Sequence, residues 1–436
     1  MQCWIFTHID NPRGRWLDEV AERFDAWEAG GVCGLVVGYV RLLDEDGTPV
    51  QAYAPDPRIY AAHGVQPPPQ MPRNPALEKK LQAMLDDAVS RGWPVYLFGG
   101  IGSVAQAQDL ANAFPQARGF VIDGPGENHY ELSFHHGGEL LEIRPGEEAR
   151  FARLGADVDR LQRGIDHLRQ ALHRLTPDKV RYHAAGGLFG SLLLCDLDED
   201  ALYWLRLRQE AARFSWQEAR ACVDGVDRKM ELGGIPRTAA FSSLTGQNYQ
   251  QMPQYFDYIF PKHYFWHRGF DGLYGTVARW AHCLAKWNPS LGEADCLAVV
   301  RALFGIDLPG INSRLDLERG FPEEFFSKVV HGETRRALDA VGDPDRVIAW
   351  VSTGRSPHAG DSMSARDLHA MLTASRDAGL RRFLFHPDPD LGAAEWRIIS
   401  GLCGELWDDT ADGYWPSDTP RLDSFSGGRR PRDAKG

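Results

Sequence analysis

Residues 119–132 read GFVIDGPGENHYEL, and this stretch decides which fold we expect for the chain. A short apolar run stops at the acidic Asp123 and is followed by Gly-Pro-Gly, a combination that favours a turn. Two more acidic residues, a histidine and a tyrosine come next. The pattern is typical of a buried parallel strand that delivers carboxylates to one edge of a sheet. A strand before an ordinary solvated turn would read similarly, so the rest of the chain must decide between the two.

Apolar runs of strand length recur along the chain and indicate an α/β fold. Segments with helical spacing of apolar residues separate most of them, such as the helix expected after Asn74-Pro75 and the one expected after Ser364. Eight parallel strands, each followed by a helix, close a (β/α)8 TIM barrel. The eight predicted strands are Cys3–Thr7, Cys33–Gly38, Pro94–Gly99, Gly119–Asp123, Thr238–Ser242, Tyr258–Tyr264, Val347–Ser352 and Arg382–His386.

Two intervals are longer than one crossover helix requires. Residues 124–236 predict a helical insertion after strand 4, with long helices over 147–178 and 198–229. On the second of these helices, Arg206 and Arg208 are expected to form surface ion pairs. Residues 268–333 predict an elaborated loop after strand 6. We therefore expect one elaborated barrel domain over 1–422 and a disordered tail over 423–436.

Composition excludes several classes of function. The chain has 436 residues, of which 43% are hydrophobic and 25% charged, and a net charge of −12. An acidic protein lacks the basic face with which nucleic-acid binders displace counterions. Neither a signal peptide nor a run long enough to span a membrane is present, which predicts a cytoplasmic protein without a membrane partner. The seven cysteines form no C-x-x-C pair, so no structural zinc site is predicted.

In a parallel barrel the functional side chains lie at the C-terminal ends of the strands. Asp123, Glu127 and Asp271 are the candidate catalytic carboxylates, because glycoside hydrolysis needs one acid and one nucleophile or base. Asp123 ends a buried strand and suits the second role. Glu127 or Asp271, on loops, suits the proton donor. The candidate substrate-binding residues combine aromatic platforms with groups that bind hydroxyls: His8, Asp10, His129, Tyr130, Lys262, His263, Tyr264, Trp266 and His386.

With these features the chain resembles the TIM-barrel glycoside hydrolases, among them the hypothetical glycosyl hydrolases. The likeness covers residues 1 to about 410 as a layout and assigns no exact family. Barrels with glutamates on strands four and seven would need a Glu where this chain has Ser352-Thr353. The arrangement of the α-galactosidase-like barrels maps onto Asp123 and Asp271. The resemblance implies a hydrolase of carbohydrate metabolism that acts on a small carbohydrate or glycoside, with no cofactor and no metal.

Two other functions stay open. His8 and Asp10 form an H-x-D at the first strand end, and with His263, His386 and Asp388 they resemble the scattered ligands of metal-dependent amidohydrolases. Zinc held by such residues would activate a water. A carbohydrate-binding barrel without catalysis is the third possibility. The sequence leaves the oligomeric state unknown.

Overall fold

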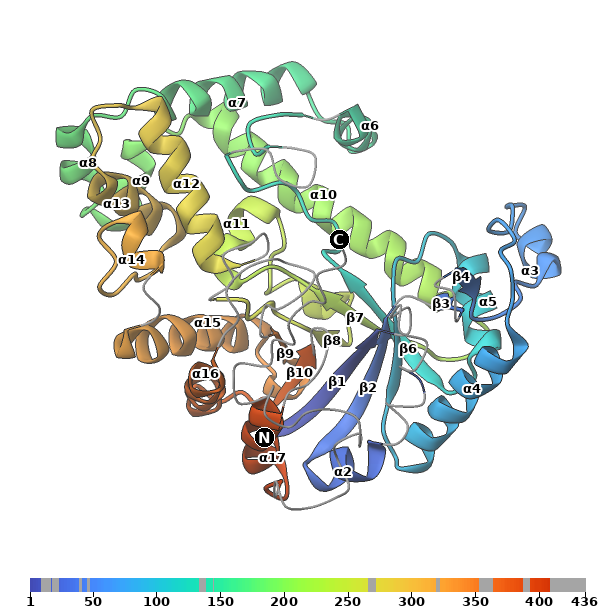
Figure 1. Cartoon of the computed structure of the whole chain (residues 1–436). Coiled ribbons are helices and arrows are strands. Elements are labelled where there is room, and N and C mark those ends of the chain that lie inside the picture. The colour runs from blue at the N-terminus through green and yellow to red at the C-terminus, as the bar shows by residue number, and fades with distance from the viewer. Residues whose placement is uncertain are drawn as a thin grey trace, which may run out of the picture.

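The computed structural model describes residues 1–8, 17, 23–38, 41–44, 48–132, 139–143, 145–265, 272–318, 322–352, 364–386 and 393–407. Its centre is a closed barrel of eight parallel strands, the architecture that the sequence predicts (Figure 1). In spatial order the strands run β8-β7-β6-β5-β2-β1-β10-β9, and bridges from Ile259 to Val347 and from Lys262 to Trp350 join the two ends. The bounds of the barrel strands are β1 (Gln2–His8), β2 (Val32–Gly38), β5 (Val95–Phe98), β6 (Ala117–Asp123), β7 (Glu231–Ile235), β8 (Tyr258–Ile259), β9 (Ile348–Ser352) and β10 (Arg382–His386).

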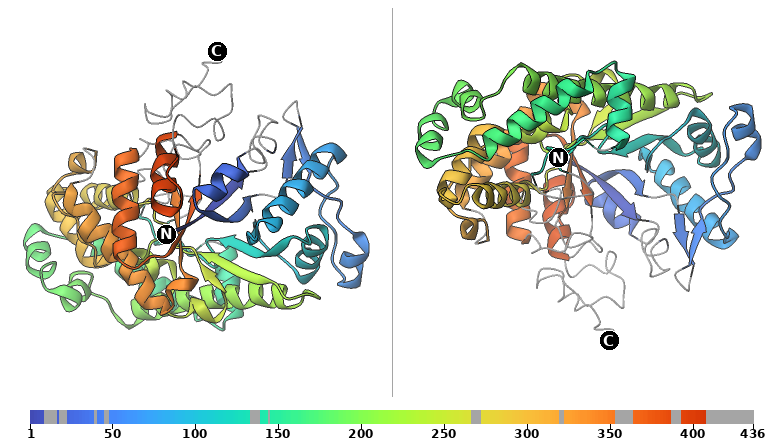
Figure 2. Two further views of the ribbon diagram at one scale, coloured as in Figure 1. Left: turned by 90° about the horizontal axis from the view of Figure 1, so that it is seen from below. Right: turned by 90° about the horizontal axis from the view of Figure 1, so that it is seen from above.

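The helices cover the outside of the barrel, and two further views show the layer on both sides (Figure 2). Helix α4 begins after Asn74, whose side chain accepts the backbone N–H groups of Ala76 and Leu77, and Ser364 caps α16 in the same way, as predicted. The helices are α2 (Phe24–Ala29), α3 (Pro57–Ala62), α4 (Pro75–Ser90), α5 (Val104–Ala113), α6 (Pro145–Arg153), α7 (Val158–Leu172), α8 (Pro177–His183), α9 (Gly187–Leu194), α10 (Glu199–Asp224), α11 (Ser242–Thr245), α12 (Leu273–Trp287), α13 (Glu293–Phe304), α14 (Arg314–Glu318), α15 (His331–Val341), α16 (Ala365–Asp377) and α17 (Ala393–Cys403). A hairpin of β3 (Arg41–Leu43) and β4 (Pro49–Gln51) lies outside the barrel. Within these described ranges, no helix is both long and apolar enough to cross a membrane.

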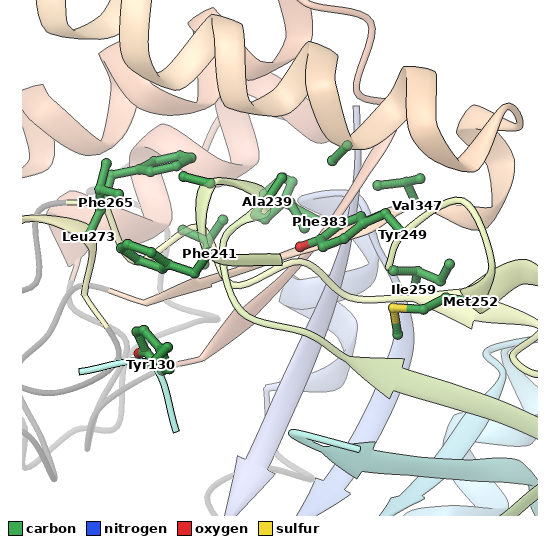
Figure 3. Packing of buried hydrophobic residues seen from close by; sticks show 14 of the residues in the cluster. Tyr130, Ala239, Phe241, Tyr249, Met252, Ile259, Phe265, Leu273, Val347 and Phe383 are labelled. Atoms are coloured by element: carbon green, nitrogen blue, oxygen red, sulfur yellow. The ribbon is translucent and has the colours of Figure 1, made fainter. Parts of the chain in front are cut away.

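Seven of the eight predicted strands are present, although β8 covers only Tyr258–Ile259 of the predicted Tyr258–Tyr264, and the prediction over 238–242 is wrong. Residues 239–241 form a 3-10 helix that runs into α11, and the fifth barrel strand is β7, several residues earlier. Ala239 and Phe241 are apolar because they pack in the core between the barrel and its outer helices (Figure 3). The true strand has the sequence ELGGI, and a Cβ at Gly233 would lie 2.5 Å from the Phe260 ring. Barrel packing requires glycine there, although glycine is rare in strands.

The two elaborated regions pack against each other as one helical cap. The helix predicted over 147–178 is three helices, α6, α7 and α8, whereas the prediction over 198–229 is confirmed as the single helix α10. Asn288, at the end of α12, accepts the backbone N–H of Leu175 at 3.0 Å and donates to the Leu172 carbonyl at 2.8 Å. An ion pair between Arg181 and Asp295, 3.1 Å long, adds a second link. The tail 423–436 lies outside the described residues.

Candidate active site

Alternation along the strands decides which side chains face the barrel interior. Val121, Phe260 and Leu384 belong to the cluster of apolar residues that fills the barrel. Because side chains alternate with a period of two, Asp123, Lys262 and His386 point to the same interior one step nearer the C-terminal end. Ile235 belongs to the same cluster, and Arg237, two residues later, points to the same side of the chain and so into the same space.

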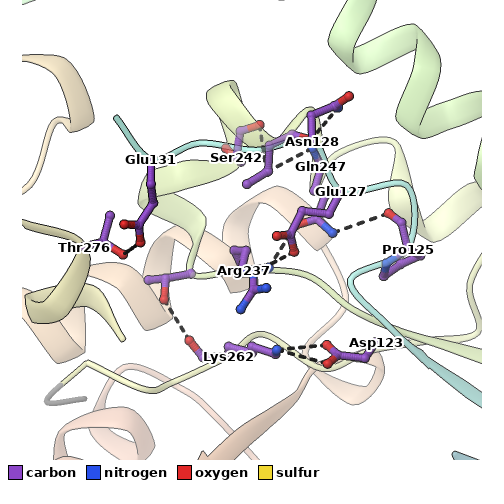
Figure 4. A network of polar contacts seen from close by, with 12 residues as sticks. Asp123, Pro125, Glu127, Asn128, Glu131, Arg237, Ser242, Gln247, Lys262 and Thr276 are labelled. Atoms are coloured by element: carbon purple, nitrogen blue, oxygen red, sulfur yellow. Dashed lines mark hydrogen bonds and ion pairs between the residues drawn. The ribbon is translucent and has the colours of Figure 1, made fainter. Parts of the chain in front are cut away.

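Asp123 and Lys262 form an ion pair at this end of the barrel (Figure 4). The Lys262 ammonium lies 2.9 Å from Oδ1 and 3.2 Å from Oδ2 of Asp123. The lysine side chain is 3% exposed, whereas that of Asp123 is 44% exposed and so open to solvent. Partial desolvation by the surrounding protein raises the pKa of Asp123, but Lys262 and Arg237 outweigh it and hold that pKa below its usual value. Burial, with Arg237 nearby, lowers the pKa of Lys262.

Glu127 and Arg237 form a second ion pair beside the first. The chain turns at Gly124, whose φ of +53° favours glycine, and the Glu127 N–H donates to the Gly124 carbonyl at 3.0 Å. Glu127 Oε2 then accepts from Arg237 Nε at 2.6 Å. Burial lowers the pKa of Arg237, but Glu127, Tyr130 and Asp123 outweigh it and raise that pKa. The four groups form one network of alternating charge, in which each carboxylate has a buried cation (Figure 4).

Tyr130 packs against the site through its contact with Arg237. The Tyr130 ring is buried, stacks on Phe241 at 5.1 Å and lies under the Arg237 guanidinium at 5.7 Å. It therefore packs in the core and supports Arg237 instead of presenting the sugar platform that the sequence suggested. The backbone carbonyl of His129 accepts a hydrogen bond from Arg208.

Arg208 corrects the expectation of a surface ion pair. Its side chain is 2% exposed, and Nε donates to the carbonyl of Leu244 at 2.7 Å while the guanidinium lies 4.8 Å from the Trp204 ring. The backbone carbonyl of Arg208 also accepts from the Asn128 side chain at 3.1 Å. Arg208 thus ties the loop after β6 to α10 and holds the loop that carries Glu127.

Aromatic rings form the floor beneath the charged groups. Phe6 lies 5.1 Å from both Phe98 and Trp350, and His386 packs edge-on against Phe6 at 4.7 Å and against Trp350 at 5.6 Å. Tyr264 belongs to the same interior cluster, with the Lys262 ammonium 6.0 Å from its ring. His386, Lys262 and Tyr264 are thus brought to the same end of the barrel as Asp123.

His263 lies on the opposite face of its segment. Its neighbours Lys262 and Tyr264 face the interior, while the His263 ring packs 4.8 Å from Phe265, which belongs to the core outside the barrel. Burial lowers the pKa of His263 to about 3, so the ring is neutral at neutral pH. The expectation that His263 opens into the cavity with Asp123 and His386 is therefore wrong.

Several predicted residues lie outside the described part of the chain: Asp10, Trp266, Asp271 and the side chain of His8. Gly272 and Leu273 follow Asp271 directly, and the Leu273 N–H donates to the Tyr264 carbonyl at 3.0 Å. Among the described residues no group of three His, Cys, Asp or Glu side chains could hold a metal ion. Of the residues that the amidohydrolase alternative uses, Asp10, Asp388 and the side chain of His8 lie outside the described part, and His263 faces away from the site.

Arg237 is the site residue that the sequence reasoning missed. It follows β7 by two residues, as Asp123 ends β6, but the misplaced fifth strand concealed that position. The segment Gly233-Gly234-Ile235-Pro236-Arg237 predicts a strand that ends near Arg237 only if glycine is allowed inside a barrel strand.

No family model matches the chain, and no curated protein matches its sequence. Several solved structures similar to it are named as glycoside hydrolases. The glycoside hydrolase domain of PgaB (BpsB) from Bordetella bronchiseptica is 11% identical with a TM-score of 0.44, over 89% of this chain and 94% of that one. A GH5_18 protein from Streptomyces cattleya in complex with GlcNAc is 13% identical with a TM-score of 0.39, over 92% and 79%. A GH18 chitinase from Pseudoalteromonas aurantia is 8% identical with a TM-score of 0.38, over 93% and 100%.

Proposed function

We propose that this chain is a glycoside hydrolase in which Asp123 is the ionised carboxylate at the reaction centre. One observation carries the proposal: a solvent-open carboxylate ends the fourth barrel strand and is held ionised by the buried Lys262 at 2.9 Å. An oxocarbenium-like transition state carries positive charge, and a fixed carboxylate stabilises or attacks it. Two carboxylates suffice for this reaction, and the proposal therefore involves no metal.

The contact between Glu127 and Arg237 supports different roles for the two remaining candidate carboxylates, Glu127 and Asp271. A proton donor needs a carboxyl group that is neutral before the reaction. The carboxylate of Glu127 is already engaged by the charge-assisted hydrogen bond that it accepts from the buried Arg237 at 2.6 Å. We therefore assign the donor role to Asp271 and a positioning role to Glu127, which fixes Arg237 beside Asp123.

Kinetics on a panel of aryl glycosides and oligosaccharides tests this proposal. Asp123→Asn removes the charge and is expected to lower kcat by at least a thousandfold. Asp271→Asn is expected to slow substrates with poor leaving groups far more than activated aryl glycosides, because the latter need little protonation. Normal turnover by Asp123→Asn on every glycoside that the wild type cleaves would refute the proposal.

Chelation separates the proposal from the metal-dependent alternative. Activity is expected to survive dialysis against EDTA. Loss of activity that added zinc restores, together with cleavage of amides instead of glycosides, would replace the glycosidase by an amidohydrolase-like hydrolase.

A further inference from the structure

A second cavity lies beside the barrel, outside the network of Asp123. It has a volume of about 660 Å³, which lies in the range of small-molecule sites. Leu97, Phe98 and Phe120 form its floor, and the glycine-rich loop 99–103 forms one wall. The opposite wall comes from Gln51 at the end of β4, from helix α3 and from the segment 66–71. Figure 1 shows α3 beside α5.

Among the residues that the structure describes, those that line this cavity are all uncharged at neutral pH. None of them is Asp, Glu, Lys, Arg or His, although 25% of the chain is charged. Tyrosine rings, prolines and glutamine amides line it instead, among them Tyr53, Tyr60 and Gln106. The nearby Asp109 is 2% exposed and accepts the Tyr60 hydroxyl at 3.0 Å, so that its charge stays behind the wall.

The cavity is held open by its own hydrogen bonds. Gln106 accepts the Gly102 N–H at 2.8 Å and donates to the Gly100 carbonyl at 3.3 Å, which fixes the glycine-rich loop. Gln51 donates to the Pro69 carbonyl at 3.3 Å and ties the segment 66–71 to the hairpin. A preformed site binds without the entropic cost of ordering its walls.

One residue joins this cavity to the barrel interior. Phe98 lines the cavity and also packs against Phe6 and Trp350 in the floor of the candidate active site. The Gly99 N–H donates to the Val121 carbonyl at 3.0 Å, two residues before Asp123 on the same strand. A chain-like ligand at the barrel end could therefore extend over β5 into the second cavity.

We infer that this cavity is a subsite for a neutral carbohydrate chain, a proposal that rests on the glycoside hydrolase function. Sugar rings combine apolar faces with many hydroxyls, and an uncharged lining of rings and amides matches both without favouring an ion. An acidic or basic sugar would lose its hydration without gaining a counter-ion. The substrate is accordingly a neutral oligosaccharide or polysaccharide with residues on both sides of the cleaved bond.

Affinity electrophoresis in native gels that contain a soluble polysaccharide tests the subsite without requiring catalysis. The neutral probes are hydroxyethylcellulose, galactomannan, arabinoxylan and glycol chitin, and the anionic counterparts are carboxymethylcellulose and polygalacturonate. A Cβ at Gly100 meets no atom within 4 Å, so Gly100→Trp adds bulk to the cavity wall without a backbone clash. Gly332→Trp is the matched control, because Gly332 is equally open and lies on α15, outside the cavity.

At least one neutral probe is expected to retard the wild type, and neither anionic probe is. Gly100→Trp and Tyr53→Ala should weaken the retardation at least tenfold, while Gly332→Trp leaves it unchanged. Failure of every neutral probe, or equal retardation of Gly100→Trp and wild type, would overturn the subsite. Retardation that depends on Gly100 in a protein that cleaves no glycoside would instead uphold the subsite and refute the proposed hydrolase.

Discussion

Replacing Lys262 by Met should shift the pH dependence of catalysis, because the ammonium of Lys262 is the nearest cation to Asp123. Coulomb's law for two unit charges 2.9 Å apart gives about 1.4 kcal/mol in water and about 6 kcal/mol at an effective dielectric constant of 20. Asp123 is 44% exposed, so solvent screening places the interaction near the lower end, at about 1.5–3 kcal/mol. Since one pKa unit is worth about 1.4 kcal/mol, the pKa of Asp123 should rise by about 1–2 units.

The sign of the effect follows from the direction of the present shift. Lys262 and Arg237 together hold the pKa of Asp123 below its usual value, and loss of either cation raises it. A raised pKa means that Asp123 becomes protonated at a higher pH, so the acidic limb of kcat/KM should move upward by about 1–2 pH units.

A full pH profile of kcat/KM on one aryl glycoside measures the shift. Lys262→Arg, which keeps the positive charge, is the matched control and should hold the limb near its wild-type position. Circular dichroism checks that both variants are folded. A limb that stays in place in Lys262→Met would show that Asp123 is not the base that the profile reports, and the assignment of Asp123 would fail with it.

Three further predictions concern stability. Asp123→Asn removes the carboxylate that pairs with the buried Lys262 ammonium and should lower the free energy of unfolding in urea by about 3 kcal/mol. The double variant Asp123→Asn/Lys262→Met should recover most of this loss. Equal stability of the single and double variants would contradict the prediction. The folded-state pKa of His263, about 3, lies below the unfolded value of about 6.5, so its contribution is complete above pH 6.5 and is lost as the pH falls. Between pH 6.5 and 4.5 the wild type should therefore lose about 2 kcal/mol more than His263→Phe, and parallel losses in the two proteins would refute the neutral buried ring. Arg208→Met should lower the free energy of unfolding by about 3 kcal/mol, because the backbone carbonyls of Leu244 and His129 lose their donor. Arg206→Met, at an exposed position of the same helix, should stay within about 0.5 kcal/mol of wild type. Similar thermal unfolding of the two variants would contradict the buried role of Arg208.

Most of the barrel could be predicted from the sequence because its strands are apolar runs that end in polar turns. Strand β7 is the exception, since Gly233 and Gly234 give it a low strand propensity. The glycines are there because Phe260 and Phe256, from the neighbouring segment, occupy the space that their side chains would need. That reason depends on residues more than 20 positions away, and no local pattern contains it.

The candidate site could be predicted only where the reasoning depended on a single strand. Asp123 follows from its own strand, but its partners require the barrel register. Lys262, His263 and Tyr264 read as one polar cluster in the sequence, yet the alternation of side chains sends Lys262 to Asp123 and His263 to the opposite face. A shift of one residue would place a neutral imidazole beside Asp123 and bury an ammonium among the outer helices. The register fixed by Phe260 in the interior therefore decides which residue tunes the carboxylate, and so whether Asp123 is ionised at the pH at which it is proposed to act.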